Sequence, residues 1–169
     1  MGSMVTSGTA VVTLPSETQI QITREFEAPK HLVYRAWTTP ELIERWWSGK
    51  RGEVIVADVD LRVGGSWRYL MTANEGYEVG FHGEFREIVP NERIVNTEIY
   101  DTGPGAEEAQ GLEPAVITTT FTEVGGRTLL TQTTECHSAE VRDMILESGM
   151  EAGMQESMDR LEQVAGSLA

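Results

Sequence analysis

Residues 53–136 consist almost entirely of short segments of β-strand character separated by turn residues. One further segment, residues 19–26, alternates apolar and polar side chains, which is the pattern of a strand buried on one face. The expected strands are residues 19–26, 53–60, 65–73, 78–89, 93–101, 114–124 and 127–136. Any fold of this chain must therefore accommodate a sheet of about seven strands.

Helices are expected on both sides of this block of strands. Pro29 can open a first helix, and Thr39 with Pro40 supplies the N-cap and first position of a second. Ser138 can cap a third helix, which Gly149 interrupts. The last helix, running to about residue 166, carries an apolar stripe of Met150, Met154, Met158, Leu161, Ala165 and Leu168. Glu156 and Arg160 fall off this stripe and are expected in water. The element order predicts the α+β class.

The length of 169 residues suits one well-buried core. Residues 1–16 are small and polar and are expected to form a flexible tail, in which residues 1–3 resemble a tag remnant. Residues 17–168 then form a single domain. The Gly-, Pro- and acid-rich residues 102–111 are expected to be a mobile loop.

Charge and cysteine content restrict partners and location. With 27 acidic and 13 basic side chains the net charge is −14, which repels nucleic acid and anionic membrane surfaces. No stretch approaches the roughly 20 apolar residues of a membrane span. The single cysteine, Cys136, cannot form an internal disulfide, and no secretory signal is visible, so a cytoplasmic location is expected. A homodimer is left open.

Turn chemistry predicts which side chains point inward. Residues 124–127 (Val-Gly-Gly-Arg) suit a two-residue hairpin, because both glycines accept positive φ. This hairpin pairs Phe121 with Leu130, Thr119 with Gln132 and Ile117 with Thr134. These residues form the more apolar face, so Thr119, Gln132 and Thr134 are expected to point towards the core.

A second hairpin is expected around residues 74–77. The favoured register pairs Trp67 with Phe85, Arg68 with Glu84, Tyr69 with Gly83 and Met71 with Phe81. The opposite charges of Arg68 and Glu84 support it. The hairpin around Pro90 has no register fixed by the sequence, so either Glu98 or Ile99 faces inward.

Several ordered motifs resemble bacterial proteins related to the activator of Hsp90 ATPase (AHSA1-type), within the START/Bet v 1-like (SRPBCC) superfamily. The motifs are Glu27-Ala28-Pro29, Val33-Tyr34-Arg35-Ala36-Trp37-Thr38, Pro40-Glu41-Leu42, Trp46-Trp47, Asp60-Leu61-Arg62-Val63-Gly64-Gly65-Ser66-Trp67, the stretch from His82 to Val95, and Gly149-Met150 with Gly153 and Leu161. The resemblance covers roughly residues 18–166. It implies a helix-grip fold: a curved antiparallel sheet around a long C-terminal helix, with a cavity between them. Residues 48–53 depart from the Gly/Pro-containing stretch that commonly follows the double Trp.

Aromatic and methionine side chains are the candidates for lining this cavity. The expected lining residues are Trp46, Trp47, Trp67, Tyr69, Met71, Phe81, Phe85, Thr119, Gln132, Thr134, Met150, Met154 and Met158. An ordinary packed core is the competing interpretation. Flexible methionines and inward-facing hydrogen-bonding groups favour a cavity.

No catalytic or metal-binding motif is recognised, and no cofactor is expected. The three histidines have no metal-ligand spacing with one another or with cysteine. Cys136 and His137 are adjacent on a strand and are expected to point to opposite faces.

Three functions follow. The leading hypothesis is a binding module for a small, mostly apolar molecule. The alternative is an enzyme of the cyclase or hydrolase type, in which a buried carboxylate such as Glu98 acts as base; superfamily members bind lipids, sterols, polyketides or flavonoids, and some cyclise or hydrolyse them. A co-chaperone role with Hsp90 as partner is implied by the resemblance alone.

Overall fold

A computed structural model describes residues 9–169 of the chain, so the tag remnant expected at residues 1–3 lies outside the described part. Within it, one antiparallel sheet has the order β1-β2-β8-β7-β6-β5-β4-β3. The strands are β1 (Val11–Thr13), β2 (Gln19–Phe26), β3 (Gly52–Val59), β4 (Ser66–Ala73), β5 (Glu78–Val89), β6 (Arg93–Thr102), β7 (Ala115–Val124) and β8 (Arg127–Glu135). The additional strand is β1, which lies where the sequence predicts a tail and pairs with β2.

The helices are α1 (Lys30–Thr38), α2 (Pro40–Trp46), α3 (Ala106–Ala109), α4 (Ala139–Glu147) and α5 (Met150–Ser167). Pro40 begins α2 as predicted, whereas Pro29 is the N-cap of α1 and not its first residue. The Ser138 hydroxyl caps α4 by accepting a hydrogen bond from the Val141 amide at 3.1 Å. The short helix α3 lies in the segment that the sequence predicts to be a mobile loop, because Gly105 takes a left-handed φ of 83° and opens one helical turn.

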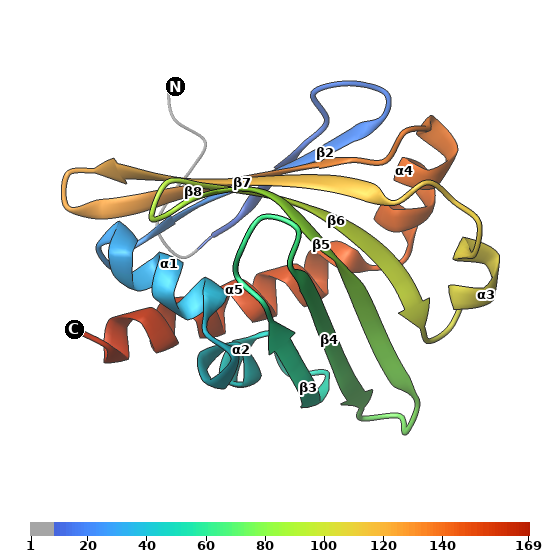
Figure 1. Ribbon diagram of the computed structural model, residues 1–169, viewed down its shortest axis with the longest axis horizontal. Helices are drawn as coiled ribbons and strands as arrows, with labels where there is room; N and C mark the ends of the chain where they lie inside the picture. The colour runs from blue at the N-terminus through green and yellow to red at the C-terminus, as the bar shows by residue number, and fades with distance from the viewer. Residues whose placement is uncertain (1–8) are drawn as a thin grey trace.

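The sheet curves around α5, which runs along its concave side (Figure 1). Helices α1 and α2 contact α5 from the side, while α3 and α4 lie at the opposite end of the molecule from the C-terminus. This is the helix-grip architecture, and the predicted fold class is confirmed.

The packed core lies under the C-terminal half of α5. Leu161 and Ala165 are fully buried there against Phe26 of β2 and Val33 of α1. Burial of such apolar surface is the main stabilising contribution in a domain of this size.

A buried ion-pair cluster joins β2 to α5 beside this core. The Arg24 side chain is 1% exposed and donates to Asp159 at 2.7 Å and to Glu162 at 2.8 Å. The second carboxylate oxygen of Glu162 accepts from the Glu27 amide at 2.9 Å. The guanidinium charge is therefore balanced within the fold, which fixes the position of α5 against the sheet.

The predicted register of the β7–β8 hairpin is confirmed. Val124 pairs with Arg127, Phe121 with Leu130, Thr119 with Gln132 and Ile117 with Thr134. The Gly-Gly turn, with φ of 61° and 82°, supplies the conformation that this two-residue loop needs.

The predicted register of the β4–β5 hairpin is wrong by two residues. Trp67 pairs with Gly83, Arg68 with His82, Tyr69 with Phe81 and Met71 with Val79. The Ala73 amide donates to the Tyr77 carbonyl at 2.7 Å, and Gly76 takes a φ of 101°, so the loop closes one residue earlier than expected. A shift of two residues leaves every side chain on its predicted face, and the aromatic residues still point inward.

A cavity as the candidate functional site

A cavity of about 1130 Å³ lies between the concave face of the sheet and the N-terminal half of α5. Its volume slightly exceeds the range of roughly 300–1,000 Å³ usual for small-molecule sites. Of the residues that the sequence predicts to line it, the structure brings together Trp46, Trp47, Trp67, Tyr69, Met71, Phe81, Phe85, Gln132, Thr134, Met150, Met154 and Met158.

Thr119 is the exception, and the prediction that it lines the cavity is wrong. It faces inward but is 1% exposed within the packed part of the sheet, next to Phe121 on β7. Along this strand the cavity wall includes Ala115 and Ile117. The cavity ends there because the side chain of Phe121, also 1% exposed, fills the space beyond.

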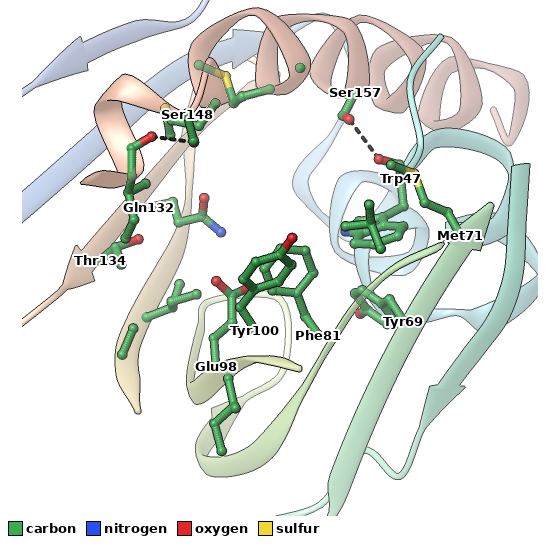
Figure 2. A pocket seen from close by; sticks show the side chains of 18 of the residues that line it. Trp47, Tyr69, Met71, Phe81, Glu98, Tyr100, Gln132, Thr134, Ser148 and Ser157 are labelled. Carbon is green, nitrogen blue, oxygen red and sulfur yellow. Dashed lines mark hydrogen bonds between the residues drawn. The ribbon is translucent and has the colours of Figure 1, made fainter. Parts of the chain in front are cut away.

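One side of the cavity is an aromatic wall formed by Trp47, Trp67, Tyr69, Phe81 and Tyr100. Neighbouring ring centroids are 4.8 to 6.0 Å apart: Trp67–Tyr69 4.8 Å, Phe81–Tyr100 5.1 Å, Trp47–Tyr69 5.4 Å and Trp47–Phe81 6.0 Å. Tilted and edge-to-face pairs at these distances stabilise one another. The wall therefore presents a continuous π surface to the cavity (Figure 2).

The aromatic wall is anchored at both ends. The Ser157 hydroxyl of α5 donates to the Trp47 carbonyl at 2.8 Å, which ties the residue after α2 to the terminal helix. The Tyr100 hydroxyl donates to the Pro104 carbonyl at 2.6 Å. These bonds hold the rings in place without filling the cavity.

Polar side chains are concentrated on β6 and β8. Gln132 and Thr134 project from β8 across the cavity from the aromatic wall (Figure 2). Asn96 and Glu98 line the cavity from β6. A mostly apolar site with a few polar groups of this kind orients a ligand as well as enclosing it.

Glu98 faces inward, which answers the question that the sequence leaves open. Phe81 pairs with Tyr100 and Phe85 with Asn96, so Glu98, between these two residues of β6, shares their face. Ile99 pairs with His82, on the outer face where His82 and Arg68 contact Asp101.

The Glu98 carboxyl is a weaker acid than an ordinary glutamate side chain. Burial raises its pKa to about 7, and among residues 9–169 no hydrogen bond or positive charge counteracts this. The pKa of Tyr69 is also raised, by burial and by the negative charge of Glu98. Near neutral pH, Glu98 therefore populates both its acid and its carboxylate form while Tyr69 keeps its proton.

The end of the cavity beside α3 and α4 is loosely covered. Leu112, Val141 and Ile145 line it there, but α4 has no buried residue and Met144 is 54% exposed. A helix with so little buried surface opens at low cost in free energy. This end is therefore the least firmly packed part of the cavity wall.

The prediction that Glu156 lies in water is wrong. The structure places this residue in the cavity wall. Its carboxylate accepts from the Lys50 amide at 3.2 Å and lies 3.5 Å from Nε of Arg51. Residues 48–53, which depart from the resembled pattern, thus pack their basic side against α5.

Sequence reasoning missed several lining residues, among them Trp37, Asn96, Tyr100, Cys136 and Ser157. Strand alternation would have found Asn96 and Tyr100 once Glu98 was known to face inward. Trp37 stacks on Trp46 with centroids 5.2 Å apart, a contact between two helices that periodicity does not reveal.

Cys136 and His137 do not form a nucleophilic pair. His137 takes a φ of 66° and its Nε2 lies 2.9 Å from the Pro114 carbonyl, while Cys136 is buried. Burial, and secondarily the negative charge of Glu135, raises the pKa of the Cys136 thiol to about 11. A protonated thiol is a poor nucleophile.

Over residues 9–169, no group of three or more His, Cys, Asp or Glu side chains could hold a metal ion. In the same range, no helix is both long and apolar enough to cross a membrane.

Comparison with known proteins identifies relatives of the whole domain. The family model described as "Activator of Hsp90 ATPase homolog 1-like protein" matches residues 27–166. No curated protein matches the chain.

Solved structures from several bacteria share the fold. A Rhodobacter sphaeroides protein has a TM-score of 0.83 at 22% identity, over 95% of this chain and 100% of its own. A Mycobacterium smegmatis protein has a TM-score of 0.81 at 22% identity, with the same coverage of 95% and 100%. An AHSA1-like protein from Aeromonas hydrophila has a TM-score of 0.64 at 21% identity, over 88% of this chain and 93% of its own. At these identities the likeness concerns the fold.

Proposed function

Because the chain belongs to the family of activator of Hsp90 ATPase homolog 1-like proteins, whose helix-grip fold is suited to ligand binding in general, we propose that it binds a small, mostly apolar molecule in its cavity. The observation that carries the proposal is the cavity itself. It has a volume of about 1130 Å³ and is bounded by the aromatic wall on one side and by Met150, Met154 and Met158 of α5 on another. Rings offer rigid contact area, and methionines adapt to different ligand shapes.

Binding can be tested by occupying the cavity with a side chain. Met154 is only partly buried although it lies on the inner stripe of α5. Met154→Trp is expected to fold and to displace an apolar fluorescent dye that binds the parent protein. Gln163→Trp, on the exposed side of the same helix, is the matched control and should leave dye binding unchanged.

Native mass spectrometry of freshly purified protein extends the same test. A bound mass present in the parent and lost in Met154→Trp supports the proposal and reports the oligomeric state at the same time. Absence of dye binding by the parent, together with severe loss of stability in Met154→Trp, would indicate a packed interior and rule the proposal out.

A second candidate function is catalysis of the cyclase or hydrolase type, favoured by the inward position of Glu98. A carboxyl with a pKa of about 7 can accept a proton from a bound substrate and return it near neutral pH. The test is turnover of polyketide-like or ester substrates by the parent and by Glu98→Gln. Turnover that is unaffected by this substitution would exclude Glu98 as the base.

Location and partners follow from the composition. The single cysteine and the net charge of −14 favour a reducing cytoplasmic environment without nucleic-acid partners. A link to Hsp90 rests on the family's name and is a question for a pull-down or ATPase assay with that chaperone.

A further inference from the structure

We propose that the preferred ligand of the cavity is a lipophilic organic cation, an amine or quaternary ammonium compound, with Glu98 as its counter-charge and the aromatic wall as its cage. This inference rests on the proposed binding function and names the class of ligand for the same site. The charges that line the cavity, the position of the aromatic rings and the absence of a cationic group beside Glu98 among the described residues all favour such a ligand.

Glu98 carries the only charge on the strand walls of the cavity. The charged lining residues are Lys50, Arg51, Glu75, Glu98, Glu108, Glu113 and Glu156. Lys50, Glu75, Glu108 and Glu113 are exposed, and Arg51 lies beside Glu156. Of these described residues, only Glu98 is neither exposed to solvent nor paired with an opposite charge. An ionised carboxylate removed from water without a partner is costly, and a ligand cation removes that cost.

The aromatic wall adds a second source of attraction for a cation. Figure 2 shows the Glu98 carboxylate beside the rings of Tyr100 and Phe81, with Tyr69 and Trp47 further along the same side. A cation within about 6 Å of an aromatic face is attracted by the ring quadrupole, most strongly when both are desolvated. A positive centre next to Glu98 would meet both the carboxylate and these rings.

The same lining disfavours anionic ligands such as fatty acids. Five of its charged groups are glutamates and two are basic, and the whole chain carries −14. The Arg51 guanidinium is directed towards Glu156 at 3.5 Å. Among the described lining residues the only other basic group is Lys50, which is exposed to solvent, so a ligand carboxylate inside the cavity would have no buried cation to pair with, and the negative charge of the protein repels an anion outside.

The groups that face Glu98 keep the same charge between pH 6 and pH 8, so a change in ligand affinity over this range reports the ionisation of Glu98. Tyr69 of β4 and Tyr100 of β6 have raised pKa values, and the pKa of Cys136 is raised to about 11, so all three stay neutral from pH 6 to pH 8. Gln132 and Asn96 do not titrate. Glu156 of α5 is paired with Arg51, and Glu108 and Glu113 lie in the exposed α3 region of the lining.

The experiment uses 4-phenylbutyl-trimethylammonium, whose charge does not depend on pH, and its neutral tert-butyl isostere, with binding measured by calorimetry at pH 6 and pH 8. The cation should bind about tenfold more tightly at pH 8, because the ionised fraction of a carboxyl with a pKa of about 7 rises about tenfold across this range. The isostere should bind equally at both values or more weakly at pH 8. In Glu98→Gln the tenfold increase in affinity for the cation between pH 6 and pH 8 should disappear.

A control variant distinguishes the effect of the Glu98 charge from that of the overall negative charge of the protein. Glu123→Gln removes a charge on the exposed end of β7, outside the cavity lining, and should keep the tenfold gain in affinity. Circular dichroism checks that each variant is folded, and the pH dependence of the parent needs no variant at all.

Three results would overturn the inference: a cation that binds no more tightly than its isostere at pH 8, a pH dependence that survives in Glu98→Gln, or tighter binding of dodecanoate than of the cation. Isostere and dodecanoate binding without a preference for the cation would leave the binding function intact. If no probe binds, both proposals fail.

Discussion

The indole N–H of Trp67 donates a hydrogen bond of 3.0 Å to the carbonyl of Thr97, although β5 lies between their strands β4 and β6. The bond passes over Gly83, which pairs with Trp67 in β5. A Cβ at Gly83 would lie 1.9 Å from the Thr97 oxygen and 2.8 Å from the indole nitrogen. The absence of a side chain at Gly83 thus lets one ring of the aromatic wall be fixed by a strand two positions away.

Gly83→Ala should therefore be strongly destabilising. The clash is with a backbone carbonyl, which cannot move away without disturbing β6, so a loss of about 2–3 kcal/mol is expected from overpacking. The urea midpoint measures it. Gly166→Ala is the control, since nothing lies within 4 Å of its Cβ in α5, and it should be stabilising by about 0.4–1 kcal/mol. Equal midpoints for the two variants would contradict the structure.

The Arg24 cluster predicts an asymmetry between its two sides. Removing both partners, Asp159→Ala with Glu162→Ala, leaves a buried guanidinium without counter-charge and should cost about 3–5 kcal/mol. Arg24→Met should cost less, because the Asp159 and Glu162 side chains are 58% and 26% exposed and can be hydrated. Chemical denaturation ranks the variants, with Gln163→Ala as helix control. The reverse order would mean that the pairs contribute little.

The raised pKa of Glu98 predicts a specific pH dependence of stability. The native state holds this proton more tightly than the unfolded chain, whose pKa is near 4.5. The stability that the bound proton contributes to the native state is fully present below pH 4.5 and is lost as the pH rises through about 7. Glu98→Gln should therefore be more stable than the parent at pH 8, by about 1–3 kcal/mol. Melting temperatures measured between pH 4.5 and pH 8 test this, with Glu123→Gln as control; parallel curves for parent and Glu98→Gln would refute it.

Cys136 should react slowly with thiol reagents. With a pKa of about 11, on the order of one thiol in a thousand is ionised at pH 8, and the side chain is 3% exposed. Labelling by a charged aromatic disulfide should be far slower than for a free cysteine and should reach the free rate in denaturant. Because Cys136 lines the cavity, a bound ligand should slow it further. Rapid labelling of the native protein would contradict the burial.

The sequence was sufficient for the order of the elements except β1 and α3, for most strand bounds and for the inward faces of β4, β7 and β8. These properties depend on local alternation and on turn residues such as Gly125 and Gly126, which act within a few positions. The β4–β5 register was wrong because Gly76, not the expected pair of charges, decides where that loop closes.

The candidate site was harder to predict from the sequence than the fold, because segments far apart along the chain come together to form it. The pairing around Glu98 depends on a register shift in β5 between Phe85 and Glu87, and no local sequence pattern reveals this shift. Thr119 and Gln132 are paired, yet only Gln132 reaches the cavity, since Phe121 fills the space beside Thr119. Whether an apolar interior is packed or encloses a cavity depends on how side chains from several distant elements fit together in the folded protein.

Helix α5 is divided between two tasks along its length. In its last turns Leu161 and Ala165 are fully buried in the core, whereas Met150 and Met154 in its first turns line the cavity. Substitutions in the first two turns therefore change what the protein can hold while the core contacts stay intact. Under the proposed binding function, substitutions at Met150 and Met154 would change ligand preference without requiring a compensating change in the packed core.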